Sequence, residues 1–199
     1  LVEKKKYMRE DNSDFVYIGI RSGIGSAYMY QNKLMDGVQG NAGYIGHTVL
    51  NAEGPMCVCG NRGCLDAYAG ELNRRYRELT NSENESYYTM RDFMKLSRNG
   101  DAVSQKILKD AAFYLGITIS NLIKILEPKM VLIASCEPLK GTTYWNIMEE
   151  TIKKYHINEM ETKLELREAQ LLEDDYALGA CCSVFEYLFE TPRLSLAIL

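Results

Sequence analysis

One imidazole and three thiols lie close together in a stretch of the chain that is rich in glycine. His47 is followed by Cys57, Cys59 and Cys64 in the pattern H-x9-C-x-C-x4-C. This is the ligand set of a closed, tetrahedral zinc site, and soft thiolates favour zinc over magnesium or calcium. Because four protein ligands leave no open position for water, the pattern predicts a structural zinc. The alternative is a loop of thiols that bind no metal.

The remaining cysteines do not suggest a disulfide framework. Cys136, Cys181 and Cys182 lie far along the chain in apolar surroundings, and we interpret them as small buried apolar residues. A chain of 199 residues is long enough to bury a core without disulfides. Clustered cysteines in such a chain indicate metal binding in a reducing compartment, so we expect a cytoplasmic protein.

Charge and hydropathy exclude other classes of protein. The formal net charge of −4 argues against a broad basic surface for nucleic acid within this chain. No run of 18 apolar residues is present, so we expect no contact with a membrane. The chain opens with leucine and with a segment typical of the end of a helix, LVEKKKYMRED. We therefore expect a fragment of a longer protein.

The order of apolar patterns predicts an α/β fold with a partly parallel sheet. Alternating or continuous apolar runs indicate strands, and recurrence at helical spacing indicates helices. Asp101 is a candidate cap for the longest helix, which Pro128 would stop. The predicted strands are 14–21, 27–31, 130–134 and 163–169, with a turn at 22–26, and the predicted helices are 64–80, 89–100, 101–126, 144–160 and 176–190.

A long central segment resembles a known family. Residues 23–70, GIGSAYMYQNKLMDGVQGNAGYIGHTVLNAEGPMCVCGNRGCLDAYAG, resemble the ROK family of repressors, open reading frames and kinases, whose pattern runs GxGxG, GxxGEIGH and CxCGxxGCxExxxS. The later segments YLGITISNLIKILEPKMVLIA and DDYALGACCSVFEYLF are also similar to that family. The resemblance implies an actin-like ATPase, ribonuclease H-like fold. It implies that residues 1–199 form a single C-terminal lobe with a zinc-binding loop at 37–66.

The resemblance also implies roles for individual residues. Zinc would be bound by His47, Cys57, Cys59 and Cys64. The sugar would lie between two lobes, held partly by the residues at the positions of Tyr44, His47 and Asp66. In family members the catalytic aspartate and a sugar-binding asparagine come from an N-terminal lobe, so no catalytic residue is expected in this chain.

Two of the sugar-facing positions depart from the family pattern. Tyr44 stands where the pattern has glutamate, and losing a hydrogen bond to a charged group costs about 1.5–3 kcal/mol. Asp66 replaces the usual glutamate and is shorter by one methylene. We expect Asp66 either to reach a sugar hydroxyl or to act only as a carboxylate in the first turn of the helix, where the N-terminal end of the helix dipole stabilises it.

The nucleotide side also departs from the pattern. After the 130–134 strand the kinases carry a glycine-rich turn, whereas this chain has Ala134, Ser135 and Cys136. Side chains there would crowd a nucleotide that needs bare backbone. Gly23 and Gly25 remain as a residual phosphate turn, and the alternative is an ordinary hairpin turn.

Three functions follow as hypotheses. The first is the effector-binding and dimerising part of a ROK-type transcriptional regulator that responds to a sugar or sugar phosphate and contacts DNA through a region outside this chain. The alternative is an ATP-dependent sugar kinase that uses Mg-ATP. The third is a dimer module without a ligand. A homodimer is expected from the resemblance, with the 101–126 helix as a candidate contact.

Overall fold

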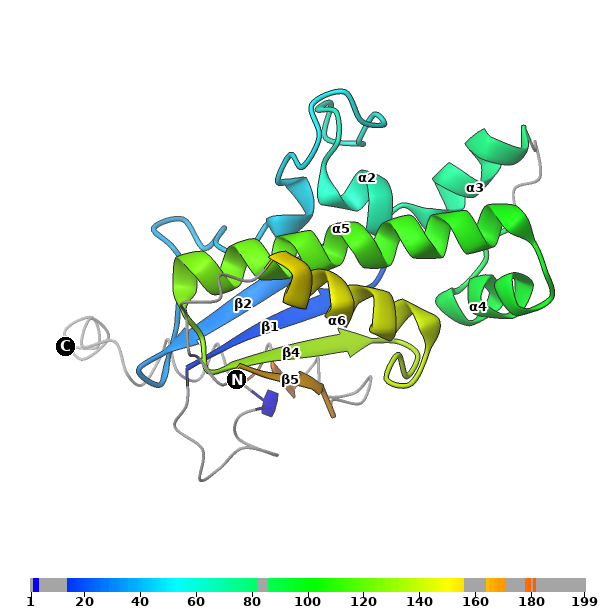
Figure 1. Ribbon diagram of the computed structural model, residues 1–199. Helices are drawn as coiled ribbons and strands as arrows, with labels where there is room; N and C mark the ends of the chain where they lie inside the picture. The colour runs from blue at the N-terminus through cyan, green and yellow to red at the C-terminus, as the bar shows by residue number, and fades with distance from the viewer. Residues whose placement is uncertain are drawn as a thin grey trace.

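A computed structural model of the protein describes residues 2–3, 14–81, 86–155, 164–170, 178–179 and 181. Five strands in this part of the chain form one mixed sheet in the order β3-β2-β1-β4-β5. Helices α5 and α6 lie across one face of the sheet (Figure 1). The predicted α/β fold with a partly parallel sheet is therefore confirmed. The strands are β1 Phe15–Ile20, β2 Ile24–Tyr30, β3 Lys33–Leu34, β4 Met130–Ser135 and β5 Glu165–Glu168.

The β1–β2 hairpin has a tighter turn than the sequence predicts. β2 begins at Ile24, three residues before the predicted start, and Gly25 pairs with Gly19 in the antiparallel register. The turn closes through the Arg21 amide, which donates to the Gly23 carbonyl at 2.9 Å. Gly25 is consequently a strand residue, and only Gly23 belongs to the turn.

β4 is the central parallel strand of the sheet. It pairs in parallel with β1 on one side and with β5 on the other. Met130 to Ala134 are all buried, as expected for a strand covered on both faces. The strand predicted from the continuous apolar run at 130–134 is therefore confirmed as β4.

The predicted long helix is confirmed as α5, Ala102–Leu126. Asp101 caps it by accepting a hydrogen bond from the Ser104 amide at 2.7 Å, and Glu127 ends it in the left-handed conformation just before Pro128. Gly116 allows the second long helix, α6 Thr143–Tyr155, to approach closely, because a Cβ there would lie 2.7 Å from Thr151 Cβ. The apolar stripe of α5 that faces the core is fully buried at Ile107, Ala111, Leu115, Ile119 and Ile123.

The helix predicted over 64–80 is broken into α2 Leu65–Ala69 and α3 Leu72–Thr80. The break occurs because the amides of Gly70 and Glu71 both donate to the Asp66 carbonyl, at 2.9 and 2.8 Å. α2 packs on α5, and the rings of Tyr68 and Tyr114 stack with centroids 3.7 Å apart. The break turns the start of α3 toward the cysteine-rich loop.

The remaining predictions have mixed outcomes. The short helix is confirmed as α4 Met90–Arg98, with a Thr89–Asp92 capping box and Gly100 at φ +92°. Cys136 and Cys181 were interpreted as buried, and this is wrong because both are exposed. Cys136 lies just beyond β4 in the connection to α6, where the core no longer covers it. Most of the predicted 176–190 helix, with Cys182, lies outside the described residues. Among the helices described, none has the length and apolar character to cross a bilayer.

Candidate metal centre

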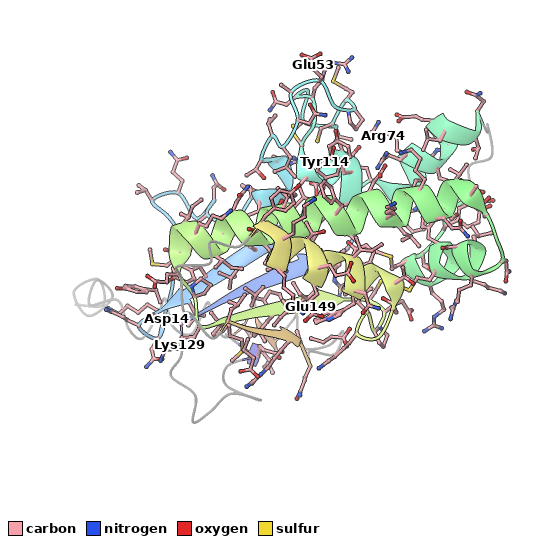
Figure 2. The ribbon with its side chains drawn as sticks, viewed as in Figure 1. Asp14, Glu53, Arg74, Tyr114, Lys129 and Glu149 are labelled. Atoms are coloured by element: carbon pink, nitrogen blue, oxygen red, sulfur yellow. The ribbon has the colours of Figure 1, made fainter. Side chains whose placement is uncertain are left out.

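The cysteine-rich loop is the predicted zinc-binding loop at 37–66, and it folds back on itself without long regular elements. Its first part contains one turn of 3-10 helix, η1 Ile45–His47. Two isolated bridges, Val49 with Cys64 and Met56 with Arg62, close the rest. Gly63 has φ +66°, and a Cβ there would lie 1.6 Å from the Asn51 carbonyl oxygen. These contacts bring His47 beside the cysteines, and the loop projects above α2 and α5 with Glu53 near its outer end (Figure 2).

The four predicted ligands lie together. One donor atom from each of His47, Cys57, Cys59 and Cys64 is within 4.8 Å of the others. The Cys59 and Cys64 sulfurs are 3.6 Å apart, and Cys57 Sγ is 3.7 Å from His47 Nδ1. Donors in a tetrahedral zinc site with zinc–sulfur bonds of about 2.3 Å are separated by about 3.7 Å. The donor set therefore fits a zinc ion in both chemistry and spacing.

The sulfurs differ in their surroundings. Burial raises the pKa of Cys57 to about 12, and burial also raises the pKa of Cys64. The backbone amide of Asn61 lowers the pKa of the exposed Cys59 thiol by hydrogen bonding to it. Because burial disfavours an isolated thiolate, the two buried sulfurs favour the thiolate form only beside a cation.

Asp66 links this loop to the β1–β2 turn. Its Oδ1 accepts a buried hydrogen bond from the Ile24 amide at 2.7 Å, and its Oδ2 lies 3.7 Å from His47 Nδ1. Burial raises the pKa of this carboxyl group. Glycines at 23, 46 and 70 surround the carboxylate, and a Cβ on Gly46 would lie 2.5 Å from Oδ1. Asp66 is therefore more than a first-turn carboxylate, because one oxygen holds the hairpin turn.

Tyr44 lies beside His47 but outside the core. Its side chain is 66% exposed, and its ring centroid is 6.4 Å from that of His47. No hydrogen bond from a described residue reaches His47 Nε2, since the contacts of this side chain involve Nδ1. The structure thus places His47 near both Tyr44 and Asp66 at the base of the loop.

Comparison with known proteins identifies the family. Residues 1–186 match the ROK family. The chain belongs to the ROK family. Its sequence relatives include a xylose repressor from Bacillus subtilis (strain 168), with 27% identity over 91% of this chain and 46% of the repressor. They also include an N-acetylmannosamine kinase from Haemophilus influenzae (strain PittEE), with 26% identity over 92% of this chain and 59% of the kinase.

Solved ROK structures share the fold. The ROK hexokinase from Thermus thermophilus matches with a TM-score of 0.79 and 26% identity, over 92% of this chain and 62% of the hexokinase. This chain spans about half the length of the xylose repressors that it matches. ROK membership is thus shown, and relatives of both kinds, repressors and kinases, have comparable identity to this chain.

The sequence predictions missed two charged residues beside the cysteine-rich loop. Glu71 and Arg74 at the start of α3 form an ion pair and contact the peptide groups on either side of Cys57. The i,i+3 spacing of opposite charges directly after the cysteine motif was the only local signal for such a pair. Their contact with the loop depends on the break between α2 and α3, which the sequence did not reveal.

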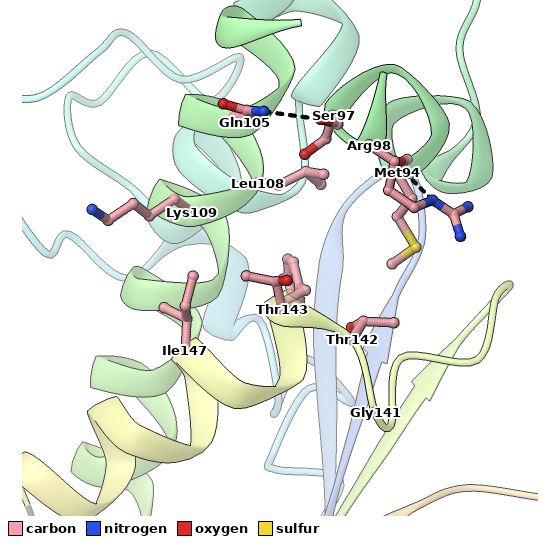
Figure 3. Close-up of a pocket in the computed structure, with 11 residues that line it drawn as sticks. Met94, Ser97, Arg98, Gln105, Leu108, Lys109, Gly141, Thr142, Thr143 and Ile147 are labelled. Carbon is pink, nitrogen blue, oxygen red and sulfur yellow. Dashed lines mark hydrogen bonds between the residues drawn. The ribbon is translucent and has the colours of Figure 1, made fainter. Parts of the chain in front are cut away.

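A separate cavity of about 590 Å³ lies between α4, α5 and the start of α6. It follows the carboxyl end of β4, the edge at which α/β sheets commonly bind ligands. The residues that line it include Leu108 and Ile147, together with Thr142 and Thr143 at the start of α6. Arg98 and Lys109 extend in opposite directions from it (Figure 3). The two cations do not converge, so the cavity does not present a focused site for an anion.

Proposed function

We propose that this chain is the effector-binding and dimerising part of a sugar-responsive ROK transcriptional regulator. A structural zinc bound by His47, Cys57, Cys59 and Cys64 holds the loop in shape. Tyr44, His47 and Asp66 form one side of the effector site. The sugar or sugar-phosphate effector would complete its contacts on a second lobe, and DNA would be contacted by a region outside this chain.

One observation carries the choice of regulator over kinase. The connection after β4, where a ROK kinase needs bare backbone for nucleotide, is filled by contacts within this chain. The Leu139 and Lys140 amides donate to Glu168 Oε1, at 2.5 and 3.3 Å. Glu137 pairs with Arg91 of α4 at 2.9 Å. Amides that bond a carboxylate are not free for phosphate, and the carboxylates themselves repel phosphate.

The sugar-facing residues support the same choice. Tyr44 offers a phenol where the family pattern has a carboxylate, and Asp66 already uses one oxygen to hold Ile24. The site keeps the zinc loop but has a reduced set of charged acceptors for hydroxyl groups. Such a set suits the reversible binding of an effector.

Two observations favour the kinase alternative. The cavity beside the carboxyl end of β4 offers space near the edge where a nucleotide would lie, and Gly23 remains at the turn after β1. Under this alternative Mg-ATP would bind across that edge. A kinase would need the cavity to accept adenosine while the Glu168 contacts give way to phosphate.

The deciding experiment uses the intact natural polypeptide. We expect calorimetry against a panel of pentoses, hexoses, N-acetylhexosamines and their phosphates to give one binding sugar. We expect that sugar to change the affinity for operator DNA in a gel-shift assay. ATP-dependent phosphorylation of any sugar in the panel would overturn the regulator proposal, and silence across the panel would favour a module without a ligand.

Restoring the family carboxylate should strengthen sugar binding. We expect Tyr44→Glu to tighten binding of the sugar about tenfold, because a hydrogen bond to a charged group contributes about 1.5–3 kcal/mol. Tyr44→Phe is the matched control, since it keeps the ring and removes only the hydroxyl. Unchanged affinity in Tyr44→Glu, measured by calorimetry, would place the sugar away from this residue.

Helix α5 offers only a small exposed surface for the contact in the proposed homodimer. This helix packs against α2, α3, α4 and α6, so its outward residues are few. Ile125, which is 75% exposed near its C-terminal end, is the main apolar candidate for a contact. Light scattering of the intact protein and of Ile125→Glu would test whether that end of the helix takes part.

A further inference from the structure

The residues that flank Cys57 in the metal loop have little apolar contact. Met56 and Val58, the neighbours of Cys57, are 47% and 76% exposed, although the Cys57 side chain itself is buried. The turn that contains Cys57 is closed by hydrogen bonds within the loop, from the Cys57 amide to the Asn61 carbonyl and from the Gly60 amide to the Cys57 carbonyl. Cys57 also packs against Cys64 and Ala67 in a small buried cluster, so further polar contacts from outside the loop can help to set the position of this turn.

Those contacts come from the start of α3. Glu71 Oε1 accepts a hydrogen bond from the Val58 amide at 3.2 Å and lies 3.5 Å from Cys57 Sγ. Arg74 Nη2 donates to the Met56 carbonyl. The two side chains thus hold the peptide groups on both sides of Cys57. Arg74 also donates to Glu71 Oε2, so the two contacts are joined in one ion-paired unit.

Charge explains why the unit needs both residues. The Glu71 side chain is only 9% exposed, and its carboxylate lies beside a sulfur that becomes a thiolate when it binds a metal. A carboxylate next to a thiolate is unfavourable unless a cation offsets it. Arg74, with a side chain 26% exposed, supplies that cation and fixes the carboxylate through its planar guanidinium group.

We propose that the Glu71–Arg74 pair positions Cys57 for metal binding and thereby slows release of the metal from the loop. The inference rests on the proposed zinc site. It adds that a brace from α3, outside the four ligands, governs how long the ion stays bound. Groups that orient metal ligands in this way commonly change metal affinity by about 10–100-fold when they are removed.

The test measures zinc release from the intact protein into excess chromogenic chelator. We expect Glu71→Ala and Arg74→Ala to release zinc at least about tenfold faster than wild type. Glu78→Ala is the matched control, because Glu78 also pairs with Arg74 but has a side chain that is 51% exposed and, among the described residues, does not contact the loop. It should release zinc at the wild-type rate. Glu71→Gln keeps an acceptor for the Val58 amide and should release zinc more slowly than Glu71→Ala.

A spectroscopic readout separates positioning from general stability. In protein substituted with Co²⁺, the sulfur-to-metal charge-transfer bands should shift in Glu71→Ala and stay unchanged in Glu78→Ala. Equal release rates for Glu71→Ala and wild type, or for Glu71→Ala and Glu78→Ala, would overturn the proposal. Wild-type protein that binds no zinc would instead overturn the metal site itself, so the two failures are distinguishable.

Discussion

Replacing Cys64 by serine is expected to abolish stoichiometric zinc binding and to lower the unfolding free energy by more than about 4 kcal/mol, because loss of a metal is one of the few changes that destabilise a protein so strongly. Cys64 is fully buried, bridges to Val49 and directly precedes α2. Because α2 packs on α5, loss of the ligand should loosen both the loop and its attachment to the long helix.

Elemental analysis and thermal unfolding measure this effect. Cys136→Ser is the matched control, because Cys136 is exposed and lies outside the ligand cluster. Limited proteolysis should show new cleavage between 51 and 63 in Cys64→Ser, and the same cleavage in wild type treated with a strong chelator. If Cys64→Ser and Cys136→Ser unfold at the same temperature with the same zinc content, the loop is not a metal site.

Gly46→Ala is expected to destabilise the protein by about 3 kcal/mol or more, because overpacking and the loss of a buried charge-assisted hydrogen bond act together. The new Cβ would lie 2.5 Å from both Asp66 Oδ1 and the Ile24 carbonyl oxygen. Since Ile24 O belongs to the backbone, a side-chain rotation cannot relieve the contact. The Ile24–Asp66 hydrogen bond should therefore break, and sugar binding at Tyr44, His47 and Asp66 should weaken with it.

Chemical denaturation of Gly46→Ala and Gly25→Ala provides the comparison. Gly25 has no heavy atom within 4 Å of its ideal Cβ position and lies in β2, so its replacement should change stability by less than about 1 kcal/mol. Near-equal stability of the two variants would mean that the hairpin turn and the metal loop are not coupled through Asp66.

Local chemistry let the sequence determine the ligand cluster and the main elements of the sheet layer. Cysteines two and five positions apart must lie close together, and His47 reaches them because the connecting loop is short and closed by glycine. The cap at Asp101, the apolar stripe of α5 and the continuous apolar run of β4 are also local patterns. Their physical basis is periodicity and capping, which need no knowledge of distant contacts.

The tertiary structure alone decided what these elements do to one another. Asp66 could have faced a sugar or a helix dipole, and its role depended on the Ile24 amide, 42 residues away in the chain. The break between α2 and α3 depended on two amides that both donate to the Asp66 carbonyl. This break brings Glu71 and Arg74 to Cys57. Hydrogen bonds between distant segments leave no periodic trace in a sequence, since each depends on where the rest of the chain has packed.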